Sequence, residues 1–359
     1  MLPNVTIVKG QGGLGRTLAG TDHYSGIIFY AGTSFSDTLK PLGFRGTLAT
    51  DCMQKITSLA DAVALGVLSD FSDETKASAA LEITHIGASG DTLRLTLPLW
   101  GGNTLDLGTY TSAGGLTVDT EATAIAAFIN SGTSNHGCTA VVNGSDLAQV
   151  DVTVKKGLGI FPNTKSLTAV YNAGTTLAVT VGAFSGGIAS KLYQYWYQIS
   201  EYFRIQPNGV LWVYFANVPS TLNFNEVYDL QVFAQGAIRK LGIFANGITA
   251  ITTVTQADLN SIGAKMNQCA TANIPYWNVL YSCDIMATTT ITNLVDTHTL
   301  TNDGLSTIIA MSLSGIAFDI YNQSGKSVNA LGTALGTISL ALTGQSIAWV
   351  SQFNISDGT

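Results

Sequence analysis

Two glycine-rich stretches contain residue types that can hold phosphate groups. Residues 10–15 (GQGGLG) match the spacing GxGxxG and follow a short expected strand. A dinucleotide site also needs a helix that begins at the third glycine, and residues 16–25 lack a helical apolar period. Residues 325–327 (GKS) resemble the end of a P-loop, but Ile320 stands where the first glycine of that motif belongs. We interpret the first stretch as a turn between strands and the second as the polar start of a helix.

Histidine, cysteine and serine show no spacing that is typical of a metal site or a nucleophile. The four histidines and four cysteines are scattered, without HExxH or CxxC, so zinc is not supported. Residues 87–91 (GASGD) lack the final glycine of GxSxG, although distant residues could still assemble a triad. We therefore expect no catalytic residues, no metal and no cofactor, and a protein that is not an enzyme. The residues in question are His23, His85, His136, His298, Cys52, Cys138, Cys269 and Cys283.

An aromatic cluster at residues 193–203 (YQYWYQISEYF) could form a stacking platform for bases or sugars, but no basic stripe interleaves it. Helical spacing predicts that Trp196 and Phe203 belong to the core. It places Tyr195 and Tyr202 on another face, which we interpret as a protein interface because tyrosine is enriched there.

The elements that would position these residues follow two patterns. Residues 1–83 and 188–359 alternate helices with continuous apolar strands such as Ser25–Ala31, which predicts an α/β core with a mainly parallel sheet. Residues 84–187 alternate with period two around one helix, and they predict an inserted β-rich module. A helix is also expected over Asp51–Leu68. The other expected elements are strands at 4–9, 92–98, 103–110, 139–142, 148–154, 176–181, 209–216, 238–244, 276–282, 306–313 and 347–350, and helices at 120–131, 188–203, 224–235, 256–272 and 328–335.

The composition is poor in charge. Charged residues make up 11% of the 359 residues, and the formal net charge is −7, whereas ordinary globular proteins have about 25% charged residues. The acidic balance argues against nucleic acid as a partner. A polar but weakly charged surface suits a protein that contacts neighbours.

Mean hydropathy is +0.29, so a membrane span must be considered. Residues 330–350 carry no charge, but they contain three glycines and several threonines and serines and divide naturally at residues 342–345. We expect no membrane insertion. The first residues lack a basic and then apolar secretory signal, so we expect the protein to be made in a reducing cytosol.

Three stretches are similar to contractile tail sheath proteins of bacteriophages and related contractile injection systems, in particular Mu-like sheaths. They are the start, MLPNVTIVKGQGGLG followed by TDHYSGIIFY; the helix TEATAIAAFIN with the strand pair and turn that end at Asn163; and the alternating elements from Leu192 to Val350. Together these stretches cover most of the chain, and the middle one is the most specific.

The resemblance implies a structural subunit that forms stacked hexameric rings around an inner tail tube and contracts to drive that tube through a cell envelope. Its partners would be copies of itself, the tube protein, the baseplate and the tail terminator, in a virion assembled in the bacterial cytoplasm. Val5, Thr6, Ile7 and Val8 would form a strand exchanged with a neighbouring subunit. The family usually continues into a second exchanged strand beyond the point where this sequence stops, at SQFNISDGT.

Two other classes stay open. Another virion component, such as a tube, baseplate or adhesin-like protein, would share the Thr/Gly/Asn-rich texture but should be nearly all-β. An α/β enzyme could bind a nucleotide through residues 10–15.

Overall fold

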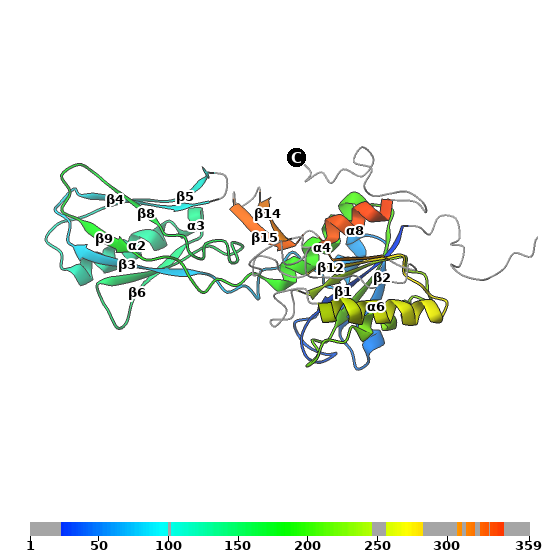
Figure 1. Cartoon of the computed structure of the whole chain (residues 1–359). Coiled ribbons are helices and arrows are strands. Elements are labelled where there is room, and N and C mark those ends of the chain that lie inside the picture. Colours follow the sequence, from blue (N-terminus) through cyan, green and yellow to red (C-terminus); the bar gives the residue numbers. More distant parts are fainter. Residues whose placement is uncertain are drawn as a thin grey trace, which may run out of the picture. The chain divides into compact units, whose positions relative to one another are not determined.

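The structure is a computed structural model that describes residues 23–99, 102–245, 256–282, 307–310, 314–319, 324–329 and 331–340. It divides into unit 1 (Met1–Leu68, Tyr195–Ser314 and Asn329–Thr359) and unit 2 (Ser69–Gln194 and Gly315–Val328) (Figure 1). The boundary expected near residue 84 falls inside strand β3 (Ser78–His85), which pairs on both sides with strands of unit 2.

Unit 1 contains a six-stranded sheet of order β13-β12-β11-β1-β10-β2. Five neighbouring strands are parallel and β2 is antiparallel to β10. Numbered along the chain, the parallel strands lie in the order 2-1-3-4-5 of a doubly wound sheet, and the expected α/β core is confirmed. The strands are β1 (Tyr24–Tyr30), β2 (Met53–Ile56), β10 (Val210–Ala216), β11 (Lys240–Phe244), β12 (Asn278–Ser282) and β13 (Thr307–Ala310).

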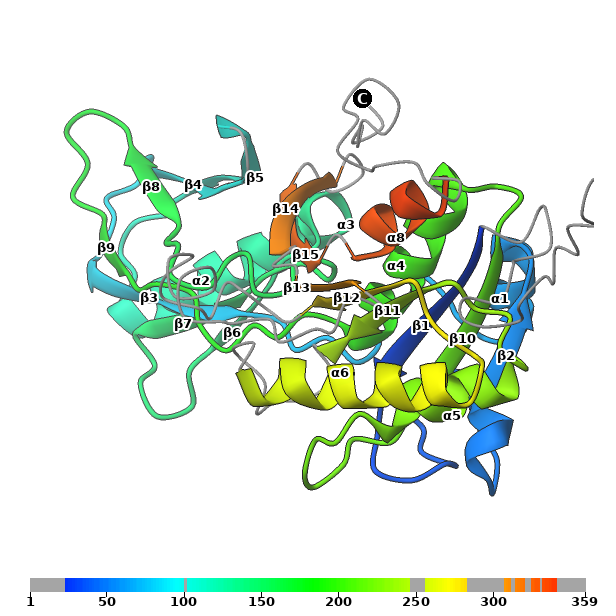
Figure 2. The same cartoon turned by 45° about the vertical axis from the view of Figure 1, so that its right-hand side comes forward.

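Helices cover both faces of this sheet (Figure 2). Helices α5 (Asn225–Phe233) and α6 (Gln256–Thr271) pack together on one face. The other face receives α8 (Leu331–Leu340) and α4 (Lys191–Ile205), of which the part from Tyr195 onward belongs to unit 1. Because both faces are covered, the central strands are buried on both sides, which explains their continuous apolar runs.

The expected helix over Asp51–Leu68 is wrong. The chain instead forms the short helix η2 (Ala49–Cys52), strand β2 and helix α1 (Leu59–Ala64). Pairing of β2 with β10 overrides the local apolar period. The Ser58 hydroxyl accepts a hydrogen bond from the Asp61 N–H, and this cap begins α1 only at Leu59.

The expected helix start at residues 325–327 is also wrong. Gly325, Lys326 and Ser327 lie in β15 (Ser324–Asn329), which pairs with β14 (Ser314–Asp319), and α8 begins after it at Leu331. Among the described residues, no helix is long and apolar enough to cross a membrane; α8 has 10 residues.

Beside the β14–β15 pair, unit 2 contains two antiparallel sheets around one core. A four-stranded sheet has the order β6-β7-β3-β9 and a three-stranded sheet the order β5-β4-β8. Helix α2 (Val118–Ser131) packs against strands of both sheets, and Thr117 caps its start, not Thr120 as expected. The remaining elements are β4 (Thr92–Pro98), β5 (Thr104–Thr111), α3 (Thr133–His136), β6 (Thr139–Val142), β7 (Gln149–Thr153), β8 (Thr168–Tyr171) and β9 (Ala178–Val181).

The two ends of the 69–194 segment are joined inside unit 2. Thr75 and Ile188 exchange backbone hydrogen bonds of 3.2 and 2.9 Å. The Asp73 carboxylate accepts hydrogen bonds from the Lys191 N–H and the Ser190 hydroxyl. Asp73, near the start of this segment, therefore stabilises the first turn of α4 at its end.

Candidate assembly surface

Several residues singled out in the sequence lie outside the described residues. They include the proposed exchange strand (Val5, Thr6, Ile7 and Val8), the glycine stretch 10–15 and His298. Strand exchange and the turn at residues 10–15 therefore stay predictions.

The described polar residues do not assemble a metal centre. No group of three His, Cys, Asp or Glu side chains that could hold a metal is found among the described residues. His136 is buried at the end of α3, and its Nδ1 accepts the Cys138 N–H at 3.1 Å. Cys52, Cys138 and Cys269 are free and buried, and burial raises the pKa of the Cys269 thiol to about 12. These groups therefore lack the features of a reactive thiolate.

The aromatic cluster of α4 belongs largely to the core. Tyr195 and Tyr202 are buried, so their interpretation as interface residues is wrong. Each phenol can be buried because its hydroxyl donates to a backbone carbonyl beside β1: Tyr195 to Tyr30 at 3.1 Å and Tyr202 to His23 at 3.2 Å. Trp196, expected in the core, is only half-buried.

The carboxyl ends of the parallel strands are the usual ligand site in a sheet of this order. After β1 the chain does not enter a helix. It turns through Gly32, and Asp37 accepts the Thr33 N–H at 2.9 Å. Close by, the Tyr30 hydroxyl donates to Glu226 at 3.2 Å, and burial raises the pKa of both groups. Asp37, Tyr30 and Glu226 therefore bring acidic and phenolic oxygens to this edge, and the Lys40 ammonium lies at the neighbouring end of β10.

A different surface lies on the segment from Leu39 to Leu68, which contains β2. Within the described part of the chain, β2 pairs on one side only, with β10. An edge strand offers backbone N–H and C=O groups to another strand.

Five large apolar side chains of this segment are exposed, and we call them the apolar rim. Leu42 and Leu48 are 73% and 62% exposed, far more than a packed residue. The Gly43 N–H donates to the Leu65 carbonyl at 2.8 Å, which brings the loop of Leu42 against the end of α1. Isolated exposed leucines are common, but five exposed large apolar side chains on one segment that also contains an edge strand make this segment a candidate interaction surface. The rim consists of Leu39, Leu42, Leu48, Val63 and Leu68.

Polar contacts hold the loop that carries Leu39 and Leu42. The Lys40 side chain is buried, and its Nζ donates to the Phe215 carbonyl at the end of β10 at 2.6 Å. Burial lowers the pKa of Lys40 to about 8. Arg45 donates to the backbone carbonyls of Lys40 and Thr38. Lys40 thus ties the loop to β10, and Arg45 ties the loop to itself.

The carboxylates of the segment are used in the same way. Asp51 accepts the N–H groups of Thr47 and Leu48 at 2.8 and 2.9 Å, and Asp61 accepts that of Thr57. These backbone hydrogen bonds lower the pKa of both aspartates. The rim is therefore built on a loop whose polar groups are largely satisfied internally.

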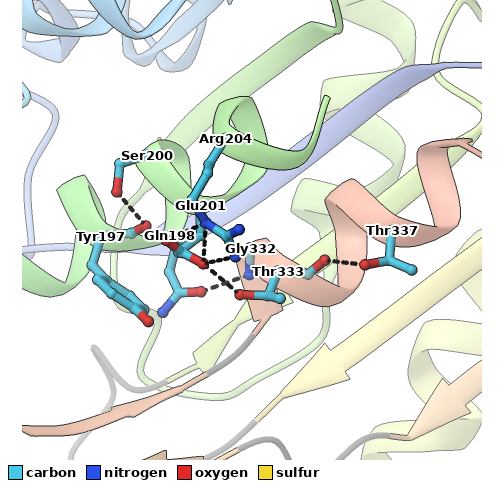
Figure 3. Close-up of polar contacts among 8 residues, drawn as sticks. All are labelled: Tyr197, Gln198, Ser200, Glu201, Arg204, Gly332, Thr333 and Thr337. Carbon is cyan, nitrogen blue, oxygen red and sulfur yellow. Dashed lines mark hydrogen bonds and ion pairs between the residues drawn. The ribbon is translucent and has the colours of Figure 1, made fainter. Parts of the chain in front are cut away.

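Helices α4 and α8 are joined by polar contacts in the core of unit 1 (Figure 3). The Gly332 N–H donates to the Gln198 Oε1 at 2.6 Å, and the Thr333 hydroxyl donates to Glu201 at 3.1 Å. Glu201 also accepts from Arg204 at 2.7 Å. A Cβ at Gly332 would lie 2.0 Å from the Gln198 carbonyl oxygen, so only glycine permits this approach. These contacts hold α8 against α4.

No family model matches the chain, and no curated protein matches it. Among solved structures, the flagellar cap protein FliD of Escherichia coli (domains D1-D2-D3) is similar at 11% identity, with a TM-score of 0.18. The similarity covers 63% of this chain and 63% of that chain. A likeness of this degree carries no argument about fold or function.

Proposed function

We propose that this protein is a structural subunit of a contractile tail sheath, which polymerises as stacked hexameric rings around an inner tube. It would contract to drive that tube through a cell envelope, in a virion assembled in the host cytoplasm. The proposed partners are copies of itself, the tube protein, and the baseplate and terminator proteins. The observation that carries the proposal is the apolar rim on the segment that contains β2, a strand that is paired on one side only among the described residues.

The rim supports polymerisation because it combines two kinds of contact. Burial of a leucine side chain contributes about 1.5–3 kcal/mol, and an open strand edge can add backbone hydrogen bonds. Contacts that join different surfaces of identical subunits build open helical arrays when they do not close. The choice of a tail sheath among possible helical arrays rests on the resemblance of the sequence to sheath proteins.

The test is assembly of the purified full-length chain at increasing concentration, measured by sedimentation velocity and negative-stain microscopy. We expect rings or tubes. The double variant Leu42→Asp/Leu48→Asp should raise the concentration needed for assembly at least about tenfold, because two leucines that assembly would bury become charged.

The matched control is Leu147→Asp, at an exposed residue of unit 2 that is 55% exposed and outside the rim. It should assemble like the parent chain. A folded parent chain that stays monomeric at high concentration would overturn the sheath proposal. If the double variant assembles as well as the parent chain, the apolar rim is not part of the assembly interface.

The 2-1-3-4-5 strand order favours a second candidate, a ligand-binding α/β protein, because such sheets bind ligands at their carboxyl edge. Thermal unfolding with nucleotides and metal ions distinguishes this function. A saturable rise in Tm with a nucleotide would support it, and no change with any of them would reject it.

A further inference from the structure

A buried histidine in unit 2 holds the turn that joins α2 to β6. His136 ends the short helix α3, and only 4% of it is exposed. Its Nδ1 accepts the Cys138 N–H at 3.1 Å, in a contact that is buried from solvent. A ring nitrogen that accepts a hydrogen bond carries no proton, so the imidazole is neutral in this arrangement, with its proton on Nε2.

The rest of the turn is fixed around this ring. A Cβ at Gly132 would lie 2.6 Å from the His136 Nε2, so the backbone packs directly against the imidazole. The Thr133 hydroxyl donates to the Cys138 carbonyl at 2.8 Å, and the Gly137 N–H donates to the Thr133 carbonyl at 2.7 Å. The ring therefore has little room to turn away while the turn stays closed.

Protonation of this ring is incompatible with the closed turn. A proton on Nδ1 would face the Cys138 N–H, so two donors would meet where one hydrogen bond now lies. The hydrogen bond would be lost and a cation would be buried, and each of these changes costs free energy. Burial lowers the pKa of His136, although the Ile129 carbonyl and the Asp106 carboxylate oppose this effect. The closed turn therefore selects the neutral imidazole.

The charged groups around His136 give a positive ring little compensation. Asp106, on β5, is paired with Arg94 at 2.7 Å, and neither described ion pair includes His136. Lys155 and Lys76 add positive charge on the side of the neighbouring cysteine, and α3 carries no other titratable residue. The acids of α2 lie in its first turn, at the end far from α3: Asp119 and Glu121.

We propose that His136 is an acid-sensitive switch, which opens the turn over residues 132–138 when the imidazole takes up a proton. Above the unfolded-state pKa of about 6.5, the ring is neutral in the closed and the open turn, and the closed turn keeps its full stability. As the pH falls below that value, the open turn binds the proton first, because its histidine is exposed to water, and the stability of the closed turn is lost progressively.

The opening should stay local. The Asn130 side chain bonds to both backbone groups of Ala140, donating to the carbonyl at 2.7 Å and accepting from the N–H at 2.8 Å. These two hydrogen bonds do not involve His136, so they should keep β6 in place after the turn has opened.

The test is hydrogen exchange of the full-length chain, measured by mass spectrometry at about pH 7.5 and about pH 5 and below the concentration at which the chain assembles. Each exchange rate is divided by the intrinsic rate of the same unfolded peptide at that pH. We expect protection of the peptide that covers residues 132–138 to fall several-fold at the lower pH, since each unit of pKa difference between the open and the closed turn is worth about tenfold. Peptides of β3 and β7 should change much less.

His136→Asn should remove this response, because the asparagine Oδ1 can accept the Cys138 N–H from the position of Nδ1 but does not titrate. The matched control is His85→Asn, at an exposed histidine of β3, which should respond like the parent chain. If His136→Asn does not fold, Asp106→Asn tests the same point. Loss of that carboxylate disfavours the charged ring and should enlarge the fall in protection.

Equal protection of the turn at both pH values in the parent chain would overturn the proposal, as would an equal acid response in the parent chain and in His136→Asn. An unchanged or smaller fall in Asp106→Asn would also contradict it. A loss of protection of the same size throughout unit 2 would overturn it as well, because the opening would then not be local. None of these results depends on whether the chain polymerises.

Discussion

The two units reach a buried core by different means. In unit 1 the central strands are covered by helices on both faces, and strands such as β1 and β10 are buried along nearly their whole length. In unit 2 the strands alternate buried and more exposed residues, as in β4, because each sheet has one face on the core. Buried charged groups also differ: unit 1 buries Lys40, whose Nζ donates to the Phe215 carbonyl, whereas unit 2 buries the carboxylate of Glu121. The comparison teaches that low charge in this chain does not imply a uniformly apolar interior.

The largest effect should come from truncation of an aromatic side chain at the centre of unit 1. Phe29 is fully buried, with ring centroids 5.0 Å from Phe215 and 5.1 Å from Tyr195. Phe29→Ala should lower the free energy of unfolding by about 3–5 kcal/mol. Hydrogen exchange measured by mass spectrometry should then increase in the core peptides of unit 1.

The matched change in unit 2 is Leu95→Ala, at a fully buried residue of β4. It should cost about 2–5 kcal/mol and increase exchange in unit 2 peptides. If either variant accelerates exchange equally in both units, the two units unfold together and the comparison fails.

A smaller effect is expected where α8 contacts α4. Gly332→Ala introduces a Cβ that would lie 2.0 Å from the Gln198 carbonyl oxygen, and the backbone must move. We expect a loss of about 1–3 kcal/mol in urea unfolding. Gly336→Ala is the control, since its nearest neighbours lie at 3.1–3.2 Å and should adjust at lower cost. Equal losses in both variants would contradict the close approach at Gly332.

The smallest effect concerns the two described ion pairs, one in each unit. The Arg94 and Asp106 side chains of unit 2 are 54% and 45% exposed, whereas those of Arg204 and Glu201 in unit 1 are 35% and 16% exposed. Exposed pairs contribute about 0.2–1 kcal/mol. Arg94→Ala should change the free energy of unfolding less than Arg204→Ala does, because its ion pair is the more exposed one. High salt should reduce this difference. A larger loss of unfolding free energy for Arg94→Ala than for Arg204→Ala would contradict the expectation that the more exposed pair contributes less.

Much of the fold could be predicted from the sequence, for physical reasons. Strands buried on both faces require continuous apolar runs, so Ser25–Ala31 indicates β1 directly. The helix predicted over residues 51–68 is wrong because apolar residues of an edge strand and a short helix together imitate a longer helical period. Strands β3 and β8 were not expected, although the alternation of β3 is plain once its partners are known.

The candidate surface was harder to predict. Leucine is usually a core residue, so the sequence does not show that Leu42 and Leu48 are exposed. Only the packing of the loop shows this. The interface role expected for Tyr195 and Tyr202 failed because helical spacing does not reveal a distant carbonyl that can satisfy a buried hydroxyl. Local spacing predicts which face a residue shares, but not which partner that face meets.

The backbone pairing of Thr75 with Ile188 has an evolutionary consequence. A segment whose first and last residues lie side by side can be gained, lost or exchanged in one recombination event, because a short hairpin turn would reconnect the flanking chain. The geometry of residues 76–187 therefore permits such an exchange. Related chains could differ completely in this segment while their α/β units remain alike.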